Sequence, residues 1–238
     1  VGLKNFEYFF TSKDWLVVTW NTVYLNILFL ITGLFFSILI ALVLSEISSR
    51  YFKKVTQSIA ILPNFISWSL VSMFVFGLLS TDVGFINSVL KALGFIQEGQ
   101  EINFYSNPNL WPGILVALKI WKGAGFGSVI YLAAIAGIDQ DMYEAAKIDG
   151  ASTMGILWRV ILPLTVPALV TVAIFQFNGV WNDFMGPLLY LSKPDLYTLA
   201  LGINFFKSQN DVQWNYLMAA SIVTMLPSLI FYFFGQKY

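Results

Sequence analysis

The sequence predicts an all-α integral membrane protein, and three features of composition and patterning predict it. Of the 238 residues, 58% are hydrophobic and only 11% are charged, whereas soluble domains carry about a quarter charged residues. Five stretches are apolar over the roughly 20 residues that a membrane-spanning helix needs. The apolar runs are long and nearly continuous, which favours helices over the short alternating strands of a membrane barrel.

The spans follow from these runs in order, and their sides of the membrane follow from charge. We expect one transmembrane domain over residues 1–238, with spans at 15–45, 55–80, 110–138, 165–191 and 214–235. The first connection, SSRYFKKV, holds Arg50, Lys53 and Lys54 without an acid, so the positive-inside rule makes it cytoplasmic. The next loop has one lysine against three acids and suits the outside. The insert at 139–163 and the C-terminus then lie in the cytoplasm.

The same alternation places Val1 outside the membrane, and no signal peptide is visible. We therefore expect five spans here and six in the full protein, with a preceding span that puts the N-terminus inside. A genuine five-span protein is the alternative.

Composition also argues against several classes of function. The net charge is zero, which gives no electrostatic case for a nucleic-acid partner. Cysteine and histidine are absent, which removes thiolate chemistry and the usual zinc ligands; we expect no metal site and no catalytic residue. The run GAGFG at 123–127 lies in an apolar span, follows no strand and lacks the phosphate-loop lysine. It predicts close helix packing or a flexible break.

The insert at 139–163 reads as two short helices. Asp139 or Asp141 can cap the first helix, and Asp149–Gly150 offers a glycine stop. Ser152 can cap a second helix, and Leu162–Pro163 is expected to end it. Small and apolar residues, Ala145, Ala146 and Ile148, stand in this otherwise polar loop. They predict either a knob for a groove on a partner protein or a loop that packs beneath its own bundle.

The pattern of the insert resembles the cytoplasmic signature loop of ABC-importer permeases. EAA at 144–146 is followed by three residues, Gly150, nine residues and then V-I-L-P at 160–163. The family pattern is EAA, then G, then I-x-L-P, so Val160 in place of isoleucine is the one, conservative, departure. The flanks LAAIAGIDQDMYEAAKIDGAS and FNGVWNDFMGPLLYLS are similar to the maltose-type permeases of carbohydrate uptake. The resemblance covers nearly the whole chain.

The resemblance implies a coupling helix that docks in a groove on a separate ATPase subunit. Glu144 would be the polar anchor, Ala145 and Ala146 would keep the docking face low, and Gly150 would make the turn; Asp149, Leu162 and Pro163 complete the set. The implied partners are a second permease subunit, two ATPase subunits that bind ATP and Mg²⁺, and an extracytoplasmic solute-binding protein. The chain itself would be a non-enzymatic, cofactor-free subunit in a bacterial or archaeal plasma membrane.

Ionisable and polar side chains inside spans are candidates for a substrate path. Lys119 and Asp183 fall at similar expected depth, so they could form an ion pair or line a path with Lys122. Amides and an indole provide the mixture of hydrogen bonding and stacking that sugars need. The remaining candidates are Gln176, Asn178, Trp181, Asn182, Asn64 and Trp68. For each of these, a hydrogen bond between helices or plain packing is the competing interpretation.

The function predicted from the sequence is import of a sugar or oligosaccharide by an ATP-driven permease. An ABC permease for an anionic solute, an acidic oligosaccharide or glycerol phosphate, is the first alternative, because the two lysines suit an anion. A secondary transporter would require duplicated halves and acidic or histidine relays, and a membrane enzyme would require paired carboxylates or a nucleophile with its base. The sequence offers neither arrangement.

Overall fold

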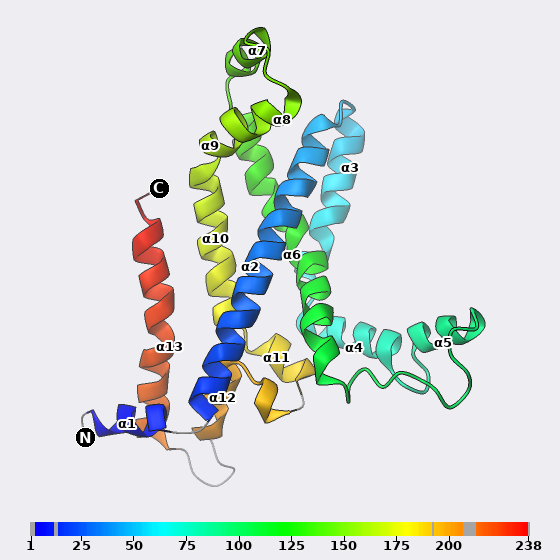
Figure 1. The fold of residues 1–238 in the computed structure, drawn as a ribbon, viewed down its shortest axis with the longest axis vertical. Coiled ribbons are helices and arrows are strands. Elements are labelled where there is room, and N and C mark those ends of the chain that lie inside the picture. Colours follow the sequence, from blue (N-terminus) through cyan, green and yellow to red (C-terminus); the bar gives the residue numbers. More distant parts are fainter. Residues whose placement is uncertain (1–2, 12–13, 192, 207–212, 238) are drawn as a thin grey trace. The chain divides into compact units, whose positions relative to one another are not determined.

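The computed structural model describes residues 3–11, 14–191, 193–206 and 213–237, and all the regular elements in those ranges are helices (Figure 1). Three described helices are long and apolar enough to cross a membrane, and the number rises to five if each broken or bent pair is counted as one span. The predicted all-α membrane fold is therefore confirmed.

The chain divides into two compact units. Unit 1 comprises Val1–Ile27, Ile66–Ala117 and Val180–Pro227, and unit 2 comprises Leu28–Phe65, Leu118–Gly179 and Ser228–Tyr238. Each unit is described below by its own contacts.

Three of the five predicted spans are single helices. They are α2 (Asp14–Glu46), α6 (Trp111–Ala136) and α13 (Trp214–Gly235), against predictions of 15–45, 110–138 and 214–235. The 3₁₀ turn η2 (Pro108–Leu110) leads into α6. Pro227 lies inside α13, where it removes one backbone donor and loosens the preceding turn.

The second predicted span, 55–80, consists of two helices joined at a break, and it counts as a span only if the bent pair is taken together. The segment holds α3 (Arg50–Ile61) with the 3₁₀ turn η1 (Leu62–Phe65), and then a separate helix, α4 (Trp68–Leu79). Pro63 lies in η1 and cannot donate a backbone hydrogen bond. Ser67 then accepts the N–H of Leu70 and starts α4 as a new helix. Hydropathy alone could not show this break, because both halves are apolar.

The fourth predicted span, 165–191, is also interrupted. Helix α10 (Val166–Trp181) ends before the short helix α11 (Met185–Tyr190). Asp183 lies in the break, and its Oδ1 accepts the N–H of Gly186 at 3.0 Å. An aspartate side chain that binds the backbone in this way competes with a continuous helix, which explains why the span stops at Trp181.

Glycines allow close helix contacts inside unit 2. A Cβ added at Gly125 of α6 would lie 1.9 Å from the carbonyl oxygen of Ala60 in α3, and one at Gly127 would lie 2.5 Å from Ser37 Oγ in α2. Ala41, Leu44, Tyr131, Leu132 and Val172 form a buried cluster in the same unit. The packing interpretation of GAGFG is therefore confirmed.

In unit 1, hydrogen bonds join the segment 195–199 to the start of α2, among several short helices. The short elements are α1 (Lys4–Thr11), η4 (Pro194–Leu196), α12 (Leu199–Gly202) and η5 (Ile203–Phe206). Asn21 donates to the carbonyls of Asp195 and Tyr197 at 2.8 and 3.1 Å, and Thr22 Oγ1 accepts the N–H of Leu199. These contacts fix the chain that follows α11.

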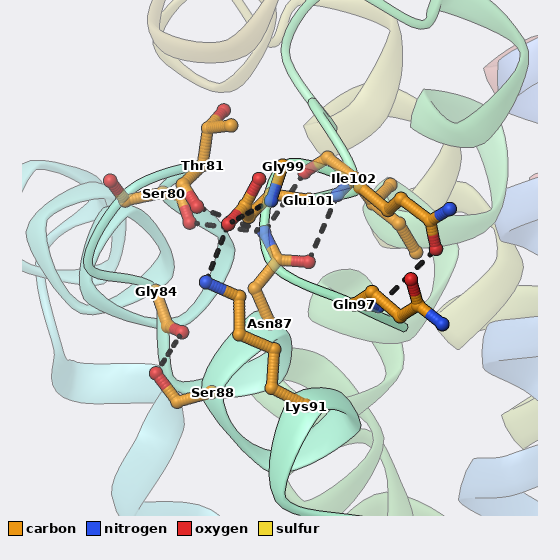
Figure 2. Close-up of polar contacts among 11 residues, drawn as sticks. Ser80, Thr81, Gly84, Asn87, Ser88, Lys91, Gln97, Gly99, Glu101 and Ile102 are labelled. Carbon is orange, nitrogen blue, oxygen red and sulfur yellow. Dashed lines mark hydrogen bonds and ion pairs between the residues drawn. The ribbon is translucent and has the colours of Figure 1, made fainter. Parts of the chain in front are cut away.

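A polar network organises the hairpin that follows α4 in unit 1; we call residues 80–107 the α5 hairpin. Asn87 of α5 (Phe85–Ala92) is buried, and its amide donates to the carbonyls of Ser80, Thr81 and Ile102 (Figure 2). Asn87 Oδ1 also accepts the N–H of Ile102 at 3.1 Å. One side chain thus joins both ends of the hairpin.

An ion pair closes the same hairpin. Lys91 Nζ lies 2.5 Å from Glu101 Oε1 (Figure 2). The hydrogen bond from Lys91 lowers the pKa of Glu101 from 4.5 to about 2, and backbone N–H groups contribute further. The same hydrogen bond raises the pKa of Lys91 above its ordinary value of 10.5.

Candidate functional site

The first half of the insert is the helix α7 (Gln140–Ile148), which starts and stops as the sequence predicts. Of the two candidate caps, Asp139 is the one used, and it accepts the N–H of Asp141 at 3.1 Å. At the other end Gly150 has φ +78°, and the N–H of Ala151 reaches the carbonyl of Ala146 at 2.9 Å. This is the glycine-terminated helix end that a left-handed residue permits.

The second half starts as predicted but ends later. Ser152 Oγ accepts the N–H of Gly155 at 3.2 Å and caps α8 (Thr153–Ile156). A π-helical turn, η3 (Leu157–Ile161), and α9 (Leu162–Leu164) follow. Pro163 therefore lies inside the helical segment instead of ending it. In the wider π turn, the N–H of Leu162 donates to the carbonyl of Leu157. A turn of this kind lets the helix continue past Pro163, which has no backbone N–H to donate. The chain then bends by 67° into α10.

Helix α7 presents polar and small side chains to solvent. Glu144, Ala145, Lys147 and Asp149 are exposed, and Ala146 is half-buried. In the described part of the chain, the Glu144 side chain forms no hydrogen bond or ion pair. Within unit 2, Figure 1 shows α7 beyond the ends of α6 and α10, joined to α10 through α8 and α9. The structure thus leaves the predicted anchor open to a partner protein.

Exposed apolar side chains accompany this polar face. Ile148 is 86% exposed, Trp158 65% and Met154 62%. Ile148 belongs to the polar helix α7, where a large exposed apolar side chain suits a protein-binding surface, whereas Met154 and Trp158 belong to a stretch that is apolar enough to enter a membrane together with α10. The alternative prediction, that the insert packs beneath its own bundle, does not fit the exposure of Ile148.

The predicted path residues of unit 2 are engaged in contacts between helices. Lys122 Nζ donates to the carbonyls of Pro63 and Asn64 at 3.3 and 2.9 Å, at the end of η1. Gln176 Nε2 donates to the Phe29 carbonyl at 2.5 Å, beside Gly33, whose missing side chain leaves room for the amide. These groups stabilise the bundle, as the packing interpretation expected. Asn178 is half-buried.

Lys119 has a different environment from Lys122. Its Nζ lies 5.7 Å from the centre of the Phe29 ring, a cation–π distance, and the side chain is half-buried. Asp183, its predicted ion-pair partner, belongs to the other unit. The pair of Lys119 with Asp183 therefore stays a prediction.

Two of the predicted path residues line a cavity in unit 1. The cavity has a volume of about 300 Å³ and is bordered by Trp181, Asn182, Phe184, Ala200, Ile203, Asn204 and Thr224. Trp181 Nε1 donates to the Thr224 carbonyl at 2.7 Å, in the turn before Pro227. The amides of Asn182 and Asn204 border the same space, so aromatic carbon and hydrogen-bonding groups are combined there.

Several cavity residues were not predicted. Asn204 belongs to a segment read as an outer loop, and Thr224 is one polar residue in an apolar span. Among the predicted residues, Trp68 lies elsewhere in unit 1, with its ring centre 6.4 Å from that of Tyr190. Among the described residues no cluster of acids, histidines or cysteines could hold a metal ion.

Comparison with known proteins finds permeases of sugar import. The chain is 36% identical over 178 residues to the polygalacturonan/rhamnogalacturonan transport system permease protein YteP of Bacillus subtilis (strain 168), covering 75% of this chain and 54% of that protein. In its fold it is similar to a bacterial ABC transporter involved in the import of the acidic polysaccharide alginate, with a TM-score of 0.86 and 29% identity over 100% of this chain and 82% of that one. The alginate transporter in complex with an alginate pentasaccharide-bound periplasmic protein matches with a TM-score of 0.83 and 29% identity, covering 99% of this chain and 81% of that one.

The chain spans about half the length of curated relatives that it matches. The match to a family profile is broader, because it runs over residues 33–238 and includes the insert, α10 and α13. The chain therefore belongs to the family of binding-protein-dependent transport system inner membrane components.

Proposed function

We propose that this chain is the membrane-spanning permease subunit of an ATP-driven importer that moves a sugar or oligosaccharide into the cytoplasm. One observation carries the proposal: helix α7 presents the EAA sequence, with Glu144 and Ala145 exposed, between α6, which is long and apolar enough to span a membrane, and a bent pair of helices that is so when taken together. The chain lacks a phosphate-binding loop motif of its own. A permease that uses ATP through a separate subunit needs such a surface.

The geometry of the insert suggests how force is transmitted. Glu144 bonds a basic residue of the ATPase, while the small Ala145 and Ala146 let α7 enter a groove. Asp149 and Gly150 fix the turn after α7. Movement of α7 then passes through α8, η3 and α9 to the bend between Leu164 and Val166, and from there to α10. Leu162 and Pro163 belong to the continuous helical segment that makes this connection.

The partners follow from the same proposal. A second permease subunit completes the path, two ATPase subunits bind ATP and Mg²⁺, and an extracytoplasmic protein delivers the solute. The alginate transporter, solved with a pentasaccharide-bound periplasmic protein, supports the last of these by similarity. In this arrangement the insert and the C-terminus lie in the cytoplasm.

The substrate passes the cavity of unit 1. Its volume of about 300 Å³ lies at the small end of ligand sites, which suits one or two sugar units of a chain in transit. The Trp181 ring offers a stacking surface, and the amides of Asn182 and Asn204 offer partners for hydroxyl groups. The candidates of unit 2 contribute to the path only if that unit borders it; they are Lys119, Gln176, Asn178 and Asn64.

An acidic oligosaccharide is the second candidate substrate. The alginate importer, named for an acidic polysaccharide, favours it by similarity, and Lys119 provides a cation on α6. Lys122 is less suited to an anion, because its ammonium already donates to two carbonyls. Substitution of Lys119 with Gln separates the two cases: it weakens transport of an acidic oligosaccharide and leaves a neutral one unchanged.

Purification of the whole transporter tests the coupling role of α7. Glu144→Ala should weaken binding of the ATPase subunit by about 30-fold or more, because truncating one partner of a buried charge pair costs at least about 2 kcal/mol. Transport in lipid vesicles should fall with it. Glu98→Ala, which removes an exposed carboxylate of the α5 hairpin, is the matched control and should change neither.

The opposite outcome is equally clear. If no ATP-hydrolysing subunit co-purifies and Glu144→Ala transports at the wild-type rate, the coupling role of α7 is wrong. Transport driven by an ion gradient would then be the better explanation, and its dependence on a proton or sodium gradient could be measured in the same vesicles.

A further inference from the structure

The first turns of α3 carry basic side chains without internal partners. Arg50, Lys53 and Lys54 stand at the N-terminal end of the helix, and its first turn holds no acid. Ser49 caps the helix through the N–H of Phe52. Among the described residues, none forms a hydrogen bond or ion pair with the Arg50 or Lys54 side chain. The positive end of the helix dipole adds to these charges.

The same helix exposes a continuous apolar face. Tyr51 is 81% exposed, Ile59 66% and Leu62 63%, and Val55 lies between them on the same face. Residues three and four apart share one side of a helix. The opposite side packs on α6, where Ala60 meets Gly125, and no residue of α3 is fully buried. One side of α3 therefore has no neighbour among the residues that the structure describes.

Lys54 borders this open face, whereas Lys53 lies on the side of Ala60. Arg50 and Lys54 are four residues apart and both exposed, so their side chains extend from neighbouring positions. Lys53 is half-buried and, by helical periodicity, lies on the side of Ala60. Lys54 is thus placed next to the apolar stripe with the exposed Arg50 one turn before it, and Lys53 is turned toward the packed side.

The position of α3 in the chain indicates what covers this apolar face. Helix α2 ends at Glu46, and residues 50–65 belong to an apolar segment long enough to enter a membrane together with α4. The start of α3 therefore lies where hydrocarbon meets water. Acyl chains suit the apolar stripe, and an anionic headgroup suits the two cations. An apolar helix of a partner would cover the stripe but leave both cations without a counter-ion.

We propose that Arg50 and Lys54 hold the headgroup of an anionic phospholipid whose acyl chains lie along Tyr51, Val55, Ile59 and Leu62. The phosphate accepts charge-assisted hydrogen bonds from the guanidinium and the ammonium. The Tyr51 ring lies at the level of the headgroup, where amphipathic aromatic side chains are enriched. The site depends on insertion of the protein in a membrane and on no property of its transported substrate.

Native mass spectrometry of the purified transporter tests the site. The protein is exchanged into nanodiscs that contain equal amounts of phosphatidylglycerol and phosphatidylcholine, and the lipids that stay bound are counted. Lys54→Gln should reduce retention of phosphatidylglycerol by about fivefold, since a basic residue near an anionic surface contributes about 1 kcal/mol. The double change Arg50→Gln/Lys54→Gln should abolish the preference over phosphatidylcholine, and Arg50→Lys should keep it.

Lys53→Gln is the matched control, because it removes the same charge from the same turn on the other side. It should leave retention unchanged, as should added inorganic phosphate. Equal loss in Lys53→Gln would mean a diffuse positive potential, and displacement by inorganic phosphate would mean a simple anion site; either overturns the proposal. So would loss of a protein partner in the double variant while phosphatidylglycerol stays bound.

Discussion

Two polar segments of this chain, the α5 hairpin and the insert, contain short helices that end alike, but they use their side chains differently. Each holds a short helix that is followed by a glycine in the left-handed region, Gly94 at φ +75° and Gly150 at φ +78°. In the hairpin, Asn87 and Lys91 turn back onto the chain and bind Ile102 and Glu101. In α7 the corresponding polar side chains, such as Glu144, are exposed and bind none of the described residues.

The difference separates a segment that stabilises itself from one available to a partner. A buried amide with four hydrogen bonds fixes a single conformation, because each unmade bond would leave a backbone group unsatisfied. An exposed carboxylate on a capped helix contributes little to folding, so it is free to serve binding. The predictions below test this contrast, from the largest expected change in stability to the smallest.

Asn87→Ala should have the largest effect. It leaves the carbonyls of Ser80, Thr81 and Ile102 without their donor and should destabilise the hairpin by about 3 kcal/mol. Hydrogen exchange at the Ile102 amide, measured by mass spectrometry, should accelerate accordingly. Asn103→Ala, an exposed asparagine with one local bond, is the control. Equal exchange in both variants would contradict the tethering role of Asn87.

The two glycines should respond alike to substitution. Gly94→Ala and Gly150→Ala each force an L-residue into the left-handed region, which should cost about 1.5 kcal/mol. The midpoint of thermal unfolding should fall by a similar amount in both. Only Gly150→Ala should also impair ATP-driven transport, because it displaces the turn after α7. A loss of transport in Gly94→Ala would show that the contrast between the segments is wrong.

The hairpin should also depend on pH through Glu101. Its folded pKa of about 2 lies below its ordinary 4.5, so the ion pair stabilises the fold fully above about pH 4.5 and is lost as pH falls toward 2. Because the pKa of Lys91 is raised, the pair is lost at the alkaline end above pH 10.5. The difference in thermal midpoint between wild type and Glu101→Gln should be largest at neutral pH and shrink toward pH 2. A pH-independent difference would exclude the ion pair as its cause.

Glu144→Ala should have the smallest effect on folding. Exposed substitutions away from packing change stability by less than about 0.5 kcal/mol, so the thermal midpoint should match that of wild type. An unchanged midpoint, combined with the loss of ATPase binding expected above, would show that Glu144 serves contact with a partner protein rather than stability of the fold. A clear fall in the midpoint would instead show that Glu144 supports the fold.

The local signals of the sequence predicted the insert well. Asp139, Gly150 and Ser152 act within three to five residues, so a cap or a glycine stop can be read directly from neighbouring letters. The one error was to end the second helix at Leu162–Pro163. It arose because a π turn lets a helix continue past a proline, which has no N–H to donate. That choice depends on how α9 must enter α10, which lies outside the reach of local rules.

The path residues show the opposite case. Gln176, Lys122 and Asp183 were candidates because polar groups are rare in spans, and each proved to bind a backbone group of the described chain. The type of residue predicted that it would be satisfied, but the partners of Gln176 and Lys122 lie on helices far apart in the sequence. Asn204 and Thr224 escaped notice for the same reason, since neither carries a local signature.

The sequence by itself determined that this chain is helical, that it is built for a membrane, and where the capped insert with its EAA sequence lies. These properties depend on composition, hydropathy and short-range capping, which act along the chain. Only the tertiary structure decided that the second and fourth spans are broken, and that glycines of the GAGFG run pack closely against α2 and α3. It also decided which polar groups border a cavity. Those outcomes depend on which backbone carbonyls and side chains from distant helices meet, because in an apolar setting each polar group must find a partner.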